Sequence, residues 1–587
     1  MTRLNEPLRL KIGAALIVLC VIVSVYALAI AVFGGFAVRS GVFRFSTHDA
    51  MRPVVVALSL GLLGVATLGA DASRMRSRLA DSLVQHYGQV IALAAASAIG
   101  VACFVFGAHI AYGADPSGYL SQARLWRAGV LQVSTPVAAD ADTVHGQQAF
   151  TPLGYQPSPT RGVIVPGYPP GLPLHFAAVS AVAGERAQFA VPPLSAAGIV
   201  IVAFLLGRRI GGNETAIIAA AACAASPILL FQAVQPMSDA TAAFWWSLAV
   251  LLLTYDSIPA AAAAGIAAGI GCVVRPNLFA MVPLLAVLAA WWLGGLRPVR
   301  RWMAFLAGPA GAALAIAWLH LSLYGSVTTS GYGNVGSLFS IDHVWPNLSR
   351  YAQWAIHTQS ALIAISIAAP FVLRRLDSGS SPMSRHRVVA FSWSALVFAA
   401  GLQAFFLLYL VLDDWFSIRF LLPALPLLLV MQAAVVAAMC RGLPRQLQSI
   451  AVLVIAVLIA SWGIDRARSL GAFYLRDSEY RYLEVAAFAR TLPADAVFLT
   501  LHHSGSLPYY NSAAIVRWDW LEPDEIDRVV SELRAKGHHV FAVIDHFERP
   551  QFTHRFAGTR TFAQLTTPVF TGGSRGGVAS LVYAITE

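Results

Sequence analysis

Charged residues are scarce in this sequence, and their scarcity excludes an ordinary soluble protein. Asp, Glu, Lys and Arg make up 12% of the 587 residues, whereas 57% are hydrophobic and the mean hydropathy is +0.66. A soluble globular chain carries about twice that share of charge, roughly 25%. A transmembrane helix needs about 20 apolar residues, and such runs recur along the sequence. The composition therefore predicts a polytopic α-helical membrane protein.

Cysteine is also rare, and its placement argues against a disulfide framework or a zinc knuckle. All five cysteines lie inside or at the ends of apolar segments, with no CxxC motif and no Cys/His spacing typical of metal sites. We interpret His502 and His503, a pair with no other ligand nearby in sequence, as surface or core residues. The glycines of residues 572–577 lack the Lys-Ser/Thr of a phosphate-binding loop. The sequence is compatible with a divalent metal but does not indicate one, and it predicts no other cofactor.

Acidic residues are fewer than basic ones, and the resulting net charge of +11 lies in the apolar part of the chain. Residues 1–465 hold 27 Lys and Arg against 16 Asp and Glu, whereas residues 466–587 hold 13 of each. Basic residues in short membrane loops mark the cytoplasmic side. Their distribution predicts a cytoplasmic N-terminus and a C-terminal segment outside the cytoplasm. An excess confined to loops at lipid headgroups gives no reason to expect a nucleic-acid partner.

The apolar runs predict about 13 transmembrane helices, the first over residues 12–33 and two consecutive ones centred near residues 198 and 223. Span boundaries are ambiguous between residues 236 and 283. No internal repeat typical of a transporter with two related halves is present. We divide the chain into residues 1–89, with two membrane helices and a cytoplasmic loop; residues 90–465, a membrane catalytic domain whose first periplasmic loop covers residues 111–187; and residues 466–587, a small periplasmic α/β domain.

Helical and alternating periodicity supports the α/β assignment of the last part. We expect helices over residues 477–492 and from Pro523, in a first helical turn, to a stop at Gly537. We expect strands over residues 496–502, 540–544 and 578–585.

The longest polar interruption of the membrane part, residues 112–175, contains the first candidate for chemistry. Asp115 follows the third predicted span closely, so its carboxylate lies at the outer interface and can act as a general base on a hydroxyl acceptor. Residues from Tyr119 onward mix apolar and polar side chains, which predicts an interfacial helix, and Asp115 can equally be the N-cap of that helix. Tyr168 opens a proline-rich corner that is rigid because proline fixes φ.

Further ionisable residues lie at the outer edges of spans. Asp239 precedes the sixth span, where an acidic residue is either functional or an N-cap. Arg275 and Arg419 lie on the outer side, against the positive-inside trend. A guanidinium there can grip a lipid phosphate bidentately, or simply snorkel to the headgroups.

These positions, in this order and on one face, resemble the GT-C superfamily of membrane glycosyltransferases, which includes protein O-mannosyltransferases and the lipid A aminoarabinose transferase. The likeness covers some 310 residues and rests on five short motifs: Gly113-Ala114-Asp115 with Tyr119-Leu120, Tyr168-Pro169-Pro170-Gly171, Ser238-Asp239, Arg275-Pro276-Asn277 and Arg419-Phe420-Leu421-Leu422-Pro423.

The resemblance implies transfer of a sugar, with inversion, from a polyprenyl-phosphate donor to a lipid, polysaccharide or protein of the envelope, on the periplasmic face of a bacterial inner membrane. Asp115 then looks like the general base, Asp239 like a second acidic site residue, and Arg275 and Arg419 like donor-phosphate ligands. Tyr119 and Tyr168 belong to the substrate loop. Two features depart from the family pattern. Pro116 follows Asp115, whereas some relatives carry paired acidic residues there. Two spans precede residue 90, and family members often lack them.

Two other classes of protein fit parts of the same pattern. One is a transporter or flippase of lipid-linked sugars, for which ionisable relays at mid-membrane depth are expected. The other is a non-catalytic envelope-assembly protein whose tail binds a partner. Convergence of Asp115, Asp239 and Arg419 on one cavity is expected of the enzyme.

Overall fold

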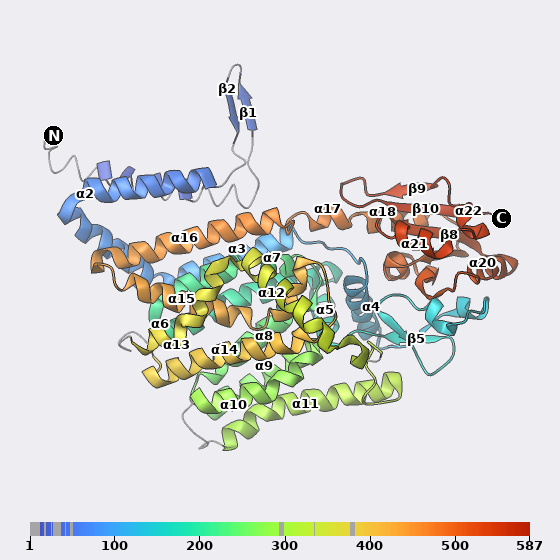
Figure 1. Cartoon of the computed structure of the whole chain (residues 1–587), viewed down its shortest axis with the longest axis horizontal. Helices are drawn as coiled ribbons and strands as arrows, with labels where there is room; N and C mark the ends of the chain where they lie inside the picture. The colour runs from blue at the N-terminus through green and yellow to red at the C-terminus, as the bar shows by residue number, and fades with distance from the viewer. Residues whose placement is uncertain are drawn as a thin grey trace.

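The computed structural model describes residues 51–292, 299–333, 335–375 and 382–586, with parts of residues 12–46. A bundle of helices occupies most of the molecule, and a five-stranded sheet lies at one end of it (Figure 1). The helices of the bundle are α2 (Met51–Gln85), α3 (Gly88–Val105), α4 (Asp115–Ala128), α5 (Gly171–Ala183), α6 (Val191–Ala224), α7 (Pro227–Ala233), α8 (Ser238–Leu253), α9 (Ile258–Val274), α10 (Val282–Trp292), α11 (Val299–Tyr324), α12 (Val344–Gln359), α13 (Ala369–Arg374), α14 (Arg385–Leu407), α15 (Leu425–Cys440) and α16 (Arg445–Ser469).

Within the described residues, five helices are long and apolar enough to cross a membrane, and up to eight spans result if each sharply bent pair counts as one. The predicted number of about 13 therefore stays a prediction. Most of the first predicted span, residues 12–33, lies outside the described residues.

Helix α6 shows how two predicted spans can be read as one long helix. Gly212 inside it has non-helical angles, with φ 82° and ψ −169°. A Cβ on Gly207 would lie 2.9 Å from the Cα of Ala216. Nine residues of straight helix extend about 13.5 Å, so this contact requires the chain to reverse at Gly212. The two halves correspond to the spans predicted near residues 198 and 223.

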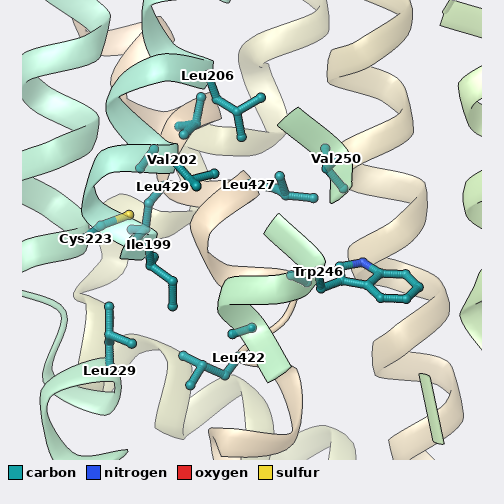
Figure 2. Packing of buried hydrophobic residues seen from close by; sticks show 14 of the residues in the cluster. Ile199, Val202, Leu206, Cys223, Leu229, Trp246, Val250, Leu422, Leu427 and Leu429 are labelled. Atoms are coloured by element: carbon teal, nitrogen blue, oxygen red, sulfur yellow. The ribbon is translucent and has the colours of Figure 1, made fainter. Parts of the chain in front are cut away.

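The centre of the bundle is packed almost entirely with apolar side chains. Figure 2 shows Ile199 and Leu206 of α6 on the same side of the view as Leu429 of α15, with Trp246 of α8 at the right. Ile199, Leu206 and Trp246 are fully buried. An interior as apolar as lipid provides no hydrophobic drive between helices, so close packing of such side chains and of small residues holds the bundle together.

The predicted long loop is structured rather than open. It begins with α4, which has Pro116 in its first turn and ends at Gly129 in the left-handed conformation, φ 70°. A three-stranded antiparallel sheet follows, in the order β3 (Val133–Ser134), β5 (Val163–Pro166), β4 (Tyr155–Pro157). Part of this segment, including Phe150, shares a buried apolar cluster with Trp518 of the chain's last part.

The last part contains a mixed sheet in the order β7-β6-β8-β10-β9, in which β6 is parallel to β7 and β8 and the other pairs are antiparallel. Its strands are β6 (Ala496–Thr500), β7 (Ala514–Val516), β8 (His539–Asp545), β9 (Phe570–Gly572) and β10 (Ser580–Ile585). Its helices are α17 (Leu475–Glu479), α18 (Arg481–Ala489), α19 (Ser506–Asn511), α20 (Ile526–Ala535), α21 (Arg549–Phe556) and α22 (Arg560–Ala563).

Two sequence-based boundaries in this part are wrong. The helix predicted over residues 477–492 is split into α17 and α18, because the two helices are separated at Tyr480. Pro523 is not in a first helical turn, since α20 begins three residues later at Ile526. The predicted stop at Gly537 agrees with its positive φ of 92°, which suits glycine.

Candidate active site

A cavity of about 660 Å³ opens where α4, α8, α9 and α11 come together with the loop before α5. Helix α4, which contributes Asp115 and Tyr119 to the cavity lining, lies at the end of the bundle nearest the five-stranded sheet (Figure 1). All six site residues predicted from the sequence line the cavity: Asp115, Tyr119, Tyr168, Asp239, Arg275 and Arg419. The two acids lie in the first turns of α4 and α8, where the positive end of the helix dipole favours a carboxylate.

Asp115 is held by two donors from distant parts of the chain. The Tyr168 hydroxyl donates to Asp115 Oδ1 at 2.6 Å, and Arg419 Nη2 lies 3.4 Å from Asp115 Oδ2. Burial raises the pKa of the Tyr168 phenol well above its ordinary value, and the charge of Asp115 raises it further, so Tyr168 stays a donor. The N-cap of α4 is Ala114, and Asp115 makes no capping hydrogen bond. The N-cap alternative for Asp115 is therefore wrong.

Asp239 forms a second charged pair beside the first. It is 1% exposed and accepts a hydrogen bond from Arg275 Nη1. The N-cap of α8 is Met237, without a side-chain cap, so the capping alternative is also wrong for Asp239. Next to it, the Tyr119 hydroxyl donates to Ser238 Oγ at 3.1 Å.

The two arginines approach the same aromatic ring. The guanidinium carbons of Arg275 and Arg419 each lie 5.3 Å from the centroid of Phe420. Arg419 Nε is buried and has no hydrogen-bond partner in the described part of the chain. A guanidinium with an unused buried N–H next to a cavity is suited to an anionic ligand, because a phosphate oxygen would satisfy that donor.

Sequence reasoning missed several aromatic residues of the cavity. Tyr332 lies in a glycine-rich segment, residues 330–336, that contains none of the predicted site residues, yet its ring centroid is 5.9 Å from that of Tyr168. The neighbouring Gly331 packs directly on the chain at Gly167, since a Cβ there would lie 2.0 Å from the Gly167 carbonyl oxygen. An aromatic residue flanked by glycines was the available signal. Tyr409 and Phe420 also line the cavity.

Comparison with solved structures places this arrangement in a known fold. ArnT from Cupriavidus metallidurans bound to undecaprenyl phosphate matches with a TM-score of 0.53 at 14% identity, over 84% of this chain and 97% of ArnT. Its apo state matches with a TM-score of 0.53 at 15% identity, over 85% and 98%. ArnT is a GT-C glycosyltransferase. This chain has the GT-C fold.

Other comparisons add little to this assignment. An oligosaccharyltransferase from Archaeoglobus fulgidus in complex with zinc and sulfate matches over 79% of this chain and 73% of its own at 12% identity, but its TM-score of 0.45 is too low to support an argument. Neither a family model nor a curated protein matches the sequence. The GT-C fold predicted from the sequence is thus confirmed by structure, while the roles of individual residues stay predictions.

Proposed function

We propose that this protein is a membrane glycosyltransferase that transfers a sugar from a polyprenyl-phosphate donor to an acceptor hydroxyl of the cell envelope, with inversion. The observation that supports this most is the joint placement of Asp115 and Arg419 on one cavity, 3.4 Å apart. We place the reaction on the periplasmic face of a bacterial inner membrane, as the distribution of basic residues predicts.

Asp115 is the proposed general base. Tyr168 and Arg419 contact different oxygens of its carboxylate and so fix its orientation towards the cavity. The acceptor hydroxyl gives its proton to Asp115 while its oxygen forms the new bond to the anomeric carbon. The bond from that carbon to the phosphate oxygen breaks, and the polyprenyl phosphate leaves with the electron pair.

Arg419 and Arg275 are the proposed phosphate ligands. Negative charge grows on the phosphate as the glycosidic bond breaks, and two fixed guanidinium groups would stabilise that charge in a partly apolar cavity. Asp239 holds Arg275 in place, so we assign it a positioning role within the site. Tyr119 and Tyr168 form the wall beside them, with ring centroids 4.8 Å apart, and would contact the sugar.

The fold neighbour ArnT was solved with undecaprenyl phosphate bound, which supports a lipid phosphate as the donor's carrier. In the part of the chain that the structure describes, a transporter of lipid-linked sugars has no comparable observation in its favour. The acidic groups nearest the cavity are paired with arginines and tyrosine in a geometry suited to one base and one phosphate.

The test compares the lipid and glycan profiles of cells that carry wild-type protein, a deletion, or Asp115→Asn. We expect Asp115→Asn to reproduce the deletion profile. Asp142→Asn is the matched control, because Asp142 is an exposed acid of the same loop region. An Asp115→Asn protein that is folded, expressed and still gives the wild-type profile would refute the assignment.

Donor binding can be tested separately with undecaprenyl phosphate and the purified protein by native mass spectrometry. Losing a charge-assisted hydrogen bond costs about 1.5–3 kcal/mol, so Arg419→Ala should weaken binding roughly 10- to 100-fold. Equal binding by wild type and Arg419→Ala would remove the proposed phosphate ligand.

A further inference from the structure

A cluster of buried ionisable groups lies outside the cavity, at the C-terminal ends of β6 and β8 in the five-stranded sheet. Asp545, at the end of β8, and Glu548, just beyond it, have side chains that are 0% and 1% exposed. His502, which follows β6, places Nδ1 2.5 Å from Glu548 Oε1. Each of these three residues offers one ligand atom, and the three atoms lie within 4.8 Å of one another.

The fixed charges of this cluster do not balance. Asp545, Glu548 and the largely buried Glu479 contribute three carboxylates, whereas Arg481 contributes one guanidinium, 3.0 Å from Glu479 and 3.5 Å from Asp545. The remaining donors to these acids carry no fixed charge: the backbone amides of His502 and Asp545 donate to Glu548, and the Ser580 hydroxyl donates to Asp545. Buried charge is unfavourable unless it is paired, so a cation next to Asp545 and Glu548 would stabilise the folded protein.

One carboxylate oxygen of the cluster is also unoccupied. Asp545 Oδ1 faces His503 Nε2 at 3.1 Å and accepts a hydrogen bond from the Ser580 hydroxyl. Asp545 Oδ2 is buried and has no hydrogen-bond partner among the residues that the structure describes. The Arg481 guanidinium approaches Asp545 Oδ1 and not Oδ2.

We propose that His502, Asp545 and Glu548 bind a divalent transition-metal ion of the Zn²⁺ class. One imidazole and two carboxylates are ligands that such ions accept, and a charge of +2 cancels the excess of the cluster. Metal–ligand distances of about 2.0–2.2 Å require ligand atoms about 3–3.5 Å apart. His502 is the ligand able to move outward from Glu548, because its side chain is 36% exposed, and water can complete the coordination on that side.

The position of this site suggests a structural role. Ser504 directly follows His503 in the sequence, and its hydroxyl accepts a hydrogen bond from the Leu153 backbone amide at 3.1 Å. Gly505 packs against Ser117 of α4 so closely that a Cβ on it would lie 2.2 Å from Ser117 Oγ. An ion at His502 would therefore fix the segment that supports the helix bearing Asp115.

The test uses the full-length protein in detergent, with any affinity tag removed, stripped with EDTA and dialysed. Titration calorimetry with ZnCl₂ and elemental analysis by mass spectrometry should give about one zinc ion per chain. Loss of one ligand should weaken binding roughly tenfold or more in His502→Ala and Asp545→Asn. His539→Ala is the control, because His539 is an exposed histidine of the same sheet whose partner is Asp495.

A second readout covers the case in which a variant does not fold. EDTA should lower the melting temperature of wild-type protein, and Zn²⁺ should restore it. Co²⁺ bound to wild type should show d–d absorption bands that Zn²⁺ abolishes by displacement. Wild type that binds no Zn²⁺, or a folded His502→Ala that binds it as tightly as wild type, would overturn the proposal.

The competing arrangement is a cluster neutralised by protons. Burial and the charge of Arg481 lower the pKa of the His502 imidazole. Its contacts with Glu548 and the charge of Asp545 raise that pKa more, so it is raised on balance. Stability from such a proton is present at low pH and lost as the pH rises through the raised pKa. A melting temperature that falls over that range without any zinc binding would replace the metal site by a protonated histidine.

Discussion

The position of Tyr168 against α4 allows the proposed site to be perturbed without removing any of its chemical groups. An ideal Cβ on Gly118 would lie 2.4 Å and 2.5 Å from two ring carbons of Tyr168, and 2.9 Å from the Cα of Gly154. Ordinary van der Waals contact begins near 3.4 Å, so Gly118→Ala must displace the Tyr168 ring by about 1 Å. The 2.6 Å bond from Tyr168 to Asp115 would then lengthen beyond hydrogen-bond range.

The two consequences of Gly118→Ala differ in size. Loss of a hydrogen bond to a charged group costs about 1.5–3 kcal/mol, which corresponds to roughly a 10- to 100-fold lower rate if the bond orients the base. Overpacking costs about 1–3 kcal/mol of stability, but alanine gains up to about 1 kcal/mol over glycine in helix propensity. We expect a net loss of stability of about 0–2 kcal/mol, which leaves most of the protein folded.

The assay is the yield of glycosylated product in membranes of cells that express each variant, normalised to folded protein by size-exclusion chromatography. Tyr168→Phe removes the same hydrogen bond without crowding and should lose a similar amount of activity. Gly100→Ala is the control, because its Cβ would meet its nearest neighbours at 3.5 Å and 3.8 Å, an ordinary contact. Wild-type product yield from folded Gly118→Ala, or an equal loss in Gly100→Ala, would refute the proposed role of Tyr168.

Three further predictions concern stability. Arg275→Met alone should lower the free energy of unfolding by about 3–5 kcal/mol, because it leaves Asp239 buried and unpaired. Adding Asp239→Leu should restore most of this loss in denaturant unfolding, whereas additive losses would contradict the coupling. Partial burial raises the pKa of Glu484, but hydrogen bonds from a hydroxyl and two backbone amides beyond β9 lower that pKa more. Wild type should therefore lose stability as the pH falls through the lowered pKa. Glu484→Gln should cost about 1–2 kcal/mol at pH 7 and show no such acid-dependent loss in thermal melts. Gly265→Leu should prevent folding because a Cβ there would lie 2.1 Å from a backbone oxygen of α11, whereas Gly311→Ala, with open space around its Cβ, should not change the melting temperature.

Much of the site could be predicted because each of its charged residues lies at the end of an apolar run. A charge at such a position is conspicuous in sequence, and the topology assigned Asp115, Arg275 and Arg419 to one face. The pairing of Asp239 with Arg275 could not be predicted, since the two lie 36 residues apart, one in the first turn of α8 and the other just after α9. Pairing depends on the direction in which each helix leaves the loop, which periodicity does not encode.

The last part of the chain shows a different limit of sequence reasoning. Strands β6, β8 and β10 have five to seven residues and are predicted close to their observed positions. Strands β7 and β9 have three residues each, too few for an alternating pattern to emerge. The buried cluster around Glu548 was missed for a related reason, because parallel pairing of β6 with β8 brings together histidines and acids some 40 residues apart in sequence.

The choice between a helix cap and a catalytic base at Asp115 shows what structure adds to sequence. Both roles place an acid in the first turn of a helix, so the residues around it are equally consistent with either. The two roles differ in whether the carboxylate bonds to its own helix or to distant residues. The donors to Asp115 are Tyr168, 53 residues away, and Arg419, 304 residues away. A carboxylate that stabilised its own helix would not need donors from two other parts of the fold. Since these donors also line the cavity, the acid lies at the space that a substrate would occupy, and this is the physical basis for proposing Asp115 as the general base.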